Sequence, residues 1–183
     1  MLFNSSEFIF FFLPIVLLVF YLVGGIGHHR VAISWLVGSS LFFYGWWNPI
    51  YLSLIMGSIL FNYAAGVALS AERSEGTRKI ILALGIGANL GAIGYFKYYN
   101  FFIDSLNRMT SSGIEAETIL LPLAISFFTF QQIAYLVDAY EGQTREYNFL
   151  HYCLFVTFFP QLIAGPIVHH REMLPQFSSD TIY

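Results

Sequence analysis

Six long apolar segments separated by short polar stretches constrain this chain more than any other feature of its sequence. A helix needs about 20 predominantly apolar residues to cross the hydrocarbon core of a bilayer. Charged residues make up only 10% of the chain and lie mostly between the segments, whereas soluble domains carry roughly 25%. The sequence therefore predicts an all-α integral membrane protein with about five to six transmembrane or re-entrant helices in one domain, residues 1–183. The segments are 8–26, 31–47, 50–70, 80–96, 119–137 and 147–167.

The positively charged residues predict how the chain is oriented in the membrane. The clearest group is the hydrophilic stretch AERSEGTRK (71–79), which places Arg73, Arg78 and Lys79 between the third and fourth segments. Short loops rich in Lys and Arg tend to stay on the cytoplasmic side. We therefore expect a multi-pass protein of the cell's inner (plasma) membrane, with its N-terminus outside.

Polar residues inside the apolar segments mark helix faces that turn away from lipid, because polar groups at membrane depth are costly. Ser126, Thr129 and Gln132 recur every third residue in the fifth segment, so they lie within about 120° of arc on a helix. Gln131 points elsewhere. Two interpretations remain open: the three side chains form hydrogen bonds between helices, or they line a polar cavity or tunnel. Pro122 is expected in the first turn of this helix.

Two asparagines and a pair of glycines predict helix packing. Asn62 and Asn89 are single amides in the third and fourth segments, and such residues commonly join membrane helices by hydrogen bonds. The fourth segment also contains Gly87 and Gly91, a G-x-x-x-G pattern with an alanine after each glycine. Small residues at this spacing allow helices to approach closely. With no strand context and no accompanying basic residue, these glycines do not predict a phosphate-binding loop.

The last apolar segment runs into an unusual stretch, FFPQLIAGPIVHHREMLPQF (158–177). Pro160 removes one backbone donor, and Gly165–Pro166 disfavours helical geometry a second time. Non-helical backbone at membrane depth is tolerated only where protein or a water-filled cavity satisfies it. The stretch is therefore either a re-entrant turn beside a cavity or the point where a helix leaves the membrane, and these residues alone favour neither.

The histidines and the single cysteine predict neither a metal centre nor a cofactor. His169 and His170 are adjacent, so on a helix they diverge by about 100° and do not face one ligand together. His28 and His29 lie in a short loop with no further ligand nearby in the sequence. Cys153 lies inside an apolar segment and is expected to be a small buried hydrophobic residue.

Several longer motifs make the chain similar to a known family. LPLAISFFTFQQIAYLVDAYEG (121–142) followed by FFPQLIAGPIVHHREMLPQF closely resembles the membrane-bound O-acyltransferase family, in its alginate O-acetyltransferase branch. GYFKYYNFF (94–102) and SLFFYGWWNP (40–49) resemble the early part of the same branch. The resemblance implies a ring of transmembrane helices around a tunnel. It also implies transfer of an acyl group from acyl-CoA or a carrier to a hydroxyl, typically on an exported polysaccharide such as alginate.

The resemblance also indicates what these residues do not supply. The catalytic histidine of the family lies downstream of the G-P-I motif, so we expect it beyond Tyr183 and assign no catalytic residue here. We therefore expect an N-terminal portion of a longer chain that is inactive alone, with Ser126, Thr129 and Gln132 lacking their partners. The candidates for tunnel lining are Ser126, Thr129, Gln132, Pro160, Gln161, Gly165, Pro166, His169, His170 and Arg171.

The expected partners follow from the same resemblance. They are the lipid bilayer, the acyl donor, the polysaccharide acceptor and periplasmic acetylation proteins, with no nucleic acid. Two alternatives remain open at this point. One is a membrane transporter or channel subunit, which also uses broken helices with polar residues at the midplane. The other is a non-catalytic membrane partner in a polysaccharide-acetylation complex.

Overall fold

The computed structural model describes residues 3–111, 114, 119–143 and 148–165, and within those ranges it contains helices and no strand. Two π-helical turns in these ranges are η1 (Phe8–Phe12) and η2 (Gly94–Tyr98). The α-helices are α1 (Leu13–Gly25), α2 (His29–Trp47), α3 (Ile50–Ser70), α4 (Glu75–Ile93), α5 (Tyr99–Thr110), α6 (Ile125–Tyr140), α7 (Phe149–Thr157) and α8 (Phe159–Ala164).

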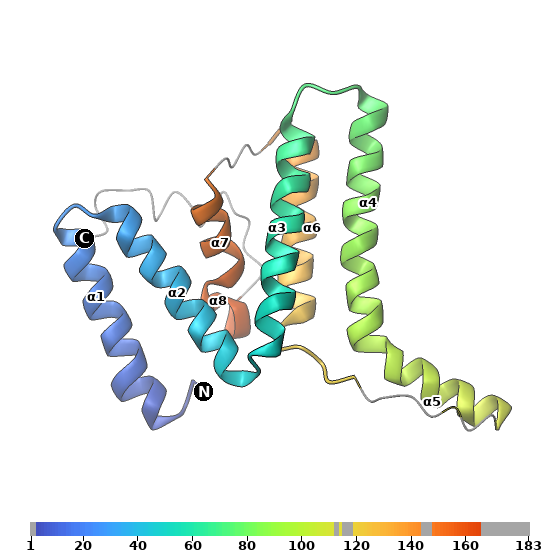
Figure 1. Ribbon diagram of the computed structural model, residues 1–183, viewed down its shortest axis with the longest axis horizontal. Helices are drawn as coiled ribbons and strands as arrows, with labels where there is room; N and C mark the ends of the chain where they lie inside the picture. Colours follow the sequence, from blue (N-terminus) through green and yellow to red (C-terminus); the bar gives the residue numbers. More distant parts are fainter. Residues whose placement is uncertain (1–2, 112–113, 115–118, 144–147, 166–183) are drawn as a thin grey trace.

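The helices pack as two connected groups. α3 and α4 both pack on α6, while α1 packs on α2, and α2 in turn packs on α7 (Figure 1). The short α8 contacts both α2 and α6. Among the described residues, three stretches are long and apolar enough to cross a membrane, namely Phe8–Gly25, Ile50–Ser70 and Glu75–Thr110. These findings confirm the prediction of an all-α, multi-pass membrane protein.

The fourth predicted segment belongs to a longer, bent helical stretch. α4 begins after Ser74, whose Oγ accepts a hydrogen bond from the Thr77 backbone N–H (3.4 Å), as an N-cap residue does. After Ile93 the chain continues through η2 into α5, which points away from the axis of α4 (Figure 1). Because π-helical turns are one of the identifiable causes of sharp kinks, η2 accounts for the bend. The sequence prediction ended this segment at residue 96 and missed α5.

Helix α5 has the pattern of a helix that lies along a membrane surface. Its side chains spaced by four and three residues form one apolar face, which is exposed in this structure: Phe102, Leu106 and Met109. The Asn100 side chain exchanges hydrogen bonds with the backbone of Ile119 (2.7 and 3.0 Å). Asn107 does the same with Ile114 (2.9 and 2.8 Å). An apolar face on one side and polar contacts on the other are typical of interfacial helices.

Helix α6 begins at Ile125, so the prediction that Pro122 occupies its first turn is wrong. Ala124 has a left-handed backbone conformation (φ 56°), through which a right-handed helix cannot continue. The carbonyl of Pro122 accepts a hydrogen bond from the Ile125 N–H (3.4 Å). Residues 119–124 therefore form a non-helical approach, and α6 extends to Tyr140, three residues beyond the predicted segment.

The close helix contact of α4 uses a different glycine from those predicted. Gly87 and Gly91 are both exposed, and a Cβ added at either would meet nothing within 4 Å. At Gly85, by contrast, a Cβ would lie 2.7 Å from Cδ1 of Leu136 on α6. Within the described helices, the expected close contact at the G-x-x-x-G pattern is therefore wrong, because α4 turns Gly85 and Asn89 inward instead.

Candidate functional site

Two amide side chains join α3 and α4 at membrane depth. Asn89 Nδ2 donates a hydrogen bond to Asn62 Oδ1 (2.6 Å), and Asn62 Nδ2 donates to Asn89 Oδ1 (3.2 Å). Each amide also donates to a carbonyl one turn earlier, that of Gly85 for Asn89 (2.8 Å) and that of Ser58 for Asn62 (2.9 Å). Both side chains are buried. The prediction that these asparagines join helices is confirmed.

From this pair the polar network continues into α6 and α7. Ser58 Oγ accepts hydrogen bonds from Gln132 Nε2 (3.0 Å) and from Asn62 Nδ2 (3.4 Å). Gln132 Oε1 accepts a further hydrogen bond from the Tyr152 hydroxyl (3.1 Å). Gln132 and Tyr152 are 0% and 1% exposed. Four helices are therefore connected through one chain of hydrogen bonds, and the expectation that Gln132 would lack partners is wrong.

A cavity of about 290 Å³ lies beside this network, between α3, α4 and α6. Apolar residues form the rest of its lining, and its polar lining residues are Ser53, Ser58, Asn62, Asn89 and Thr129. Two of the three lining helices, α3 and α4, belong to stretches that are long and apolar enough to span a membrane. Polar groups at such depth usually face protein or a water-filled cavity. The cavity can therefore hold a polar part of a ligand beside the spanning stretches.

The three polar residues predicted on one arc of α6 occupy three different settings. Thr129 is buried and lines the cavity, and Gln132 belongs to the network. Ser126 lies in the first turn of α6, where its Oγ accepts a hydrogen bond from Lys97 Nζ (3.3 Å). The ammonium group of Lys97 also lies 5.6 Å from the ring centroid of Tyr98. Helical spacing correctly predicted that the three side chains share one arc of α6. The neighbouring helices, however, differ along the length of this arc. The role of these residues as tunnel lining stays a prediction.

The interruption between α7 and α8 is buried in protein. Phe158, which lies between the two helices, has non-helical backbone angles (φ −51°, ψ 104°). In a continuous helix the Phe159 N–H would donate to the Phe155 carbonyl. Here the Phe159 N–H donates to Ser40 Oγ of α2 (3.4 Å), and the Phe155 carbonyl accepts from Gln131 Nε2 of α6 (2.9 Å). Side chains of two other helices thus satisfy the freed backbone groups, which favours a break inside the protein over a simple helix exit.

The break lies just before the predicted position. Pro160 is the second residue of α8 and is exposed, and at the start of a helix its missing N–H costs nothing. Gln161 is buried, and its carbonyl accepts a hydrogen bond from the Gly165 N–H (2.9 Å) where α8 ends. The remaining candidates of this stretch lie outside the described residues: Pro166, His169, His170 and Arg171.

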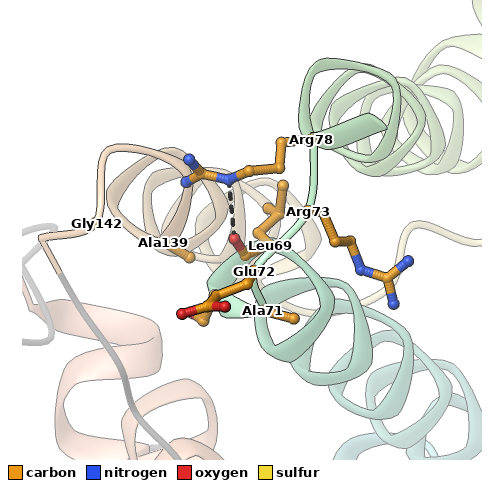
Figure 2. A pocket seen from close by; sticks show the side chains of 8 residues that line it. Leu69, Ala71, Glu72, Arg73, Arg78, Ala139 and Gly142 are labelled. Atoms are coloured by element: carbon orange, nitrogen blue, oxygen red, sulfur yellow. Dashed lines mark hydrogen bonds between the residues drawn. The ribbon is translucent and has the colours of Figure 1, made fainter. Parts of the chain in front are cut away.

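The predicted cytoplasmic loop forms a second, smaller pocket of about 210 Å³ (Figure 2). Arg78 Nε donates to the carbonyl of Leu69 near the end of α3 (3.0 Å). The same guanidinium donates to the carbonyl of Tyr140 at the end of α6 and lies 5.0 Å from the centroid of its ring. Arg73 points away from this contact (Figure 2). Because a cationic side chain near the last carbonyls stabilises a helix C-terminus, Arg78 acts as a clamp on α3 and α6.

Sequence reasoning missed Ser58, Ser40 and Tyr152 as members of the polar contacts. Ser58 precedes Asn62 by four residues, so the two share a helix face, and that spacing was the available signal. The pairing of Gln132 with Ser58 spans 74 residues, and that of Phe159 with Ser40 spans 119. Among the described residues, no group of three or more His, Cys, Asp or Glu side chains could hold a metal ion.

Comparison with known proteins finds relatives that are named as O-acetyltransferases and O-acetylases. It is 42% identical over 97% of its length to a peptidoglycan O-acetyltransferase of Helicobacter pylori. It is 40% identical over 99% of its length to a probable alginate O-acetylase, AlgI, of Pseudomonas putida, and 39% identical to the protein of the same name in Pseudomonas aeruginosa. No protein-family model and no solved structure matches the chain.

These similarities confirm the predicted resemblance to the alginate O-acetyltransferase branch of the membrane-bound O-acyltransferase family. The chain is a homologue of these enzymes along nearly all of its length. It spans 38% of the length of the Helicobacter and P. putida relatives and 35% of the P. aeruginosa relative.

Proposed function

We propose that this chain is part of an integral membrane O-acyltransferase, which transfers an acetyl or other acyl group to hydroxyls of an exported polysaccharide. The observation that carries the proposal is the 42% identity to the Helicobacter peptidoglycan O-acetyltransferase over 97% of this chain. The identities to proteins named alginate O-acetylase support the same reaction class. The donor in this proposal is acyl-CoA or a carrier-bound acyl group.

Two structural observations support a route for polar reactants within the helices. The cavity between α3, α4 and α6 presents hydroxyl and amide groups beside two spanning stretches. The break between α7 and α8 is held by side chains of α2 and α6, as expected for non-helical backbone that borders protein. In this proposal, residues 1–183 supply part of the tunnel wall. The general base that a hydroxyl acceptor needs is the histidine expected beyond Tyr183.

The proposed setting is the inner (plasma) membrane, with the N-terminus outside and the acceptor reached with help from periplasmic acetylation proteins. A reporter fused within the loop between α3 and α4 tests the orientation. A reporter that fluoresces only in the cytoplasm should be active when inserted after Arg73, within the loop 71–74. Fluorescence from a fusion before Phe8 and none after Arg73 would reverse the orientation.

The activity is tested by complementation with the full-length gene. Its deletion should remove O-acetyl groups from the exported polysaccharide, and re-expression should restore them, measured by NMR of the purified polymer. Residues 1–183 expressed alone should restore none. Unchanged acetylation in the deletion strain would contradict the proposed function. Acetylation by residues 1–183 alone would contradict the expectation that the catalytic histidine lies beyond them.

A further inference from the structure

The cavity beside the polar network contains a hydroxyl whose proton is directed away from the network. A serine hydroxyl has one O–H donor and two acceptor lone pairs. Gln132 Nε2 donates to Ser58 Oγ (3.0 Å), and Asn62 Nδ2, whose two protons also face the Ser58 carbonyl and Asn89 Oδ1, lies 3.4 Å from the same oxygen. In the described part of the chain, the Ser58 O–H donates to no acceptor. Since Ser58 lines the cavity, its proton is available to an acceptor atom that enters there.

Ser53 provides an internal comparison, because it lines the same cavity one and a half turns earlier in α3. The hydroxyl of Ser53 donates to the carbonyl of Ile50 (2.7 Å), so its proton is already used. Ser58 differs because the amides of Gln132 and Asn62 approach its oxygen. The network therefore converts one of two neighbouring serines into a donor for a ligand.

The position of Ser58 restricts which acceptor can reach it. It lies eight residues after the start of α3, roughly 12 Å along a helix of about 31 Å, so it lies well inside the hydrocarbon region. The ester groups of bilayer lipids lie in the interfacial regions outside the hydrocarbon core. A carbonyl that reaches this depth has to be brought by a ligand that enters the protein.

The lining of the cavity suits an acyl group. Gly57, Ala88 and Ala92 form part of its wall, and a Cβ added at Gly57 would meet nothing within 4 Å. Leu54 and Phe61 make the lining mostly apolar, which suits the apolar part of an acyl group. The Ser58 O–H at the side of the cavity is one donor. It matches one carbonyl oxygen, which is an acceptor without a proton.

We propose that Ser58 binds the carbonyl oxygen of the donor's acyl group in the cavity between α3, α4 and α6. This assignment rests on the proposed function, because it takes the acyl thioester of the transfer reaction as the ligand. Ser58 orients the acyl group by a hydrogen bond to its carbonyl, and Gln132, which donates to Ser58 Oγ, is the positioning residue that directs the Ser58 O–H. A carbonyl held in this way is also polarised towards attack by a hydroxyl.

The test measures the carbonyl itself in the full-length protein, reconstituted in lipid nanodiscs. The probe is S-acetyl pantetheine labelled with ¹³C at the thioester carbonyl, which is the end shared by acyl-CoA and carrier-bound donors. Ser58→Ala should weaken its binding about twofold to tenfold, the range for one neutral hydrogen bond. It should also raise the infrared frequency of the bound ¹³C carbonyl. Ser58→Thr should restore the wild-type frequency.

Four further variants separate ligand binding from structural damage. Ser34→Ala is the matched control, because Ser34 is an exposed helix serine outside this cavity whose hydroxyl donates to the Arg30 carbonyl (2.8 Å), and it should leave affinity and frequency unchanged. Gln132→Ala keeps the Ser58 O–H but no longer directs it, so it should weaken probe binding less than Ser58→Ala does. Gly57→Leu fills the cavity and should abolish binding, whereas Gly87→Leu, on the exposed face of α4, should not.

The assignment to Ser58 is overturned if wild type does not bind the probe, or if wild type and Ser58→Ala give the same carbonyl frequency. It is also overturned if a phospholipid labelled with ¹³C at its ester carbonyls gives the Ser58-dependent shift instead, since the occupant would then be a bilayer lipid. These spectra do not depend on polysaccharide acetylation. Failure of the complementation test therefore contradicts the proposed function separately.

Discussion

At η2 the chain bends where none of the five residues of the π-helical turn is buried, whereas between α7 and α8 it breaks next to the buried Thr157 and Phe159. The exposed bend keeps backbone hydrogen bonding by a change of helix type, since a π-helix pairs its groups within the same segment. The buried break gives up one such pair and replaces it with Ser40 and Gln131. An unpaired backbone group has no water partner in lipid, so only a segment surrounded by protein can use the second solution.

The difference indicates how each interruption is held. The bend at η2 redirects the chain from α4 into the amphipathic α5. The break between α7 and α8 depends on side chains of α2 and α6, so it requires the packing of helices that are distant in the sequence. The four predictions below test this comparison, from the largest expected effect to the smallest.

The aromatic packing at the buried break should contribute most to stability. The Phe159 ring lies 5.3 to 5.9 Å, centroid to centroid, from three other rings, those of Phe8, Phe12 and Phe43. Phe159→Ala should lower the free energy of unfolding by about 3–5 kcal/mol, as for other buried phenylalanines. Unfolding in mixed micelles, followed by circular dichroism, measures this change. Phe101→Ala in the exposed α5 (64% exposed) should change it by no more than about 0.5 kcal/mol. Equal losses would contradict the comparison.

Gln131 should matter because its side chain substitutes for a backbone donor. Gln131→Leu keeps a similar volume but leaves the Phe155 carbonyl buried without that donor. The expected loss is about 1 kcal/mol, the net value of one hydrogen bond, because the change also removes Gln131 Oε1, a buried oxygen without a hydrogen-bond partner in the described structure. The same micelle unfolding experiment measures it. Wild-type stability in Gln131→Leu would show that the carbonyl finds another donor and that α6 does not support the break.

Variants of two adjacent serines of α2 distinguish the effect of the hydrogen bond at the break from the effect of burial. Ser40→Ala removes the acceptor of the Phe159 N–H and should cost about 1 kcal/mol. It should also speed hydrogen exchange at the Phe159 amide. Ser39 is likewise buried but makes no contact with that amide, so Ser39→Ala should leave its exchange unchanged. Faster exchange in both variants would attribute the effect to helix α2 as a whole.

Gly94 should show the opposite sign at the exposed bend. Its backbone is right-handed helical (φ −54°), and a Cβ would meet nothing within 4 Å. Because alanine restricts the unfolded chain, Gly94→Ala should be neutral or should stabilise by up to about 1 kcal/mol. Thermal unfolding in detergent measures the change. A clear loss of stability would mean that η2 requires the freedom of glycine.

Part of the candidate site could be predicted because its signals are local. The apolar segments predicted the helices, and the single amides Asn62 and Asn89 predicted contacts between helices. The chemistry of Pro160 predicted a break in this stretch, but the structure places the break at Phe158, two residues earlier. The start of α6 could not be predicted, because Ala124 adopts a left-handed conformation that is unusual for alanine. Helix α5 was missed because its amphipathic pattern is short and follows a bend.

The sequence by itself determined that this protein is helical, apolar and built for a membrane, because hydropathy and helical period depend on neighbouring residues alone. Its similarity to O-acetyltransferases likewise follows from the amino-acid sequence alone. Only the tertiary structure decided that Gln132 meets Ser58 and that Phe159 meets Ser40, 74 and 119 residues apart in the chain. It also decided that Gly85 rather than Gly87 faces another helix. In lipid, apolar faces do not drive helices together, so these few polar and close contacts select the arrangement, and they form only once distant helices are packed.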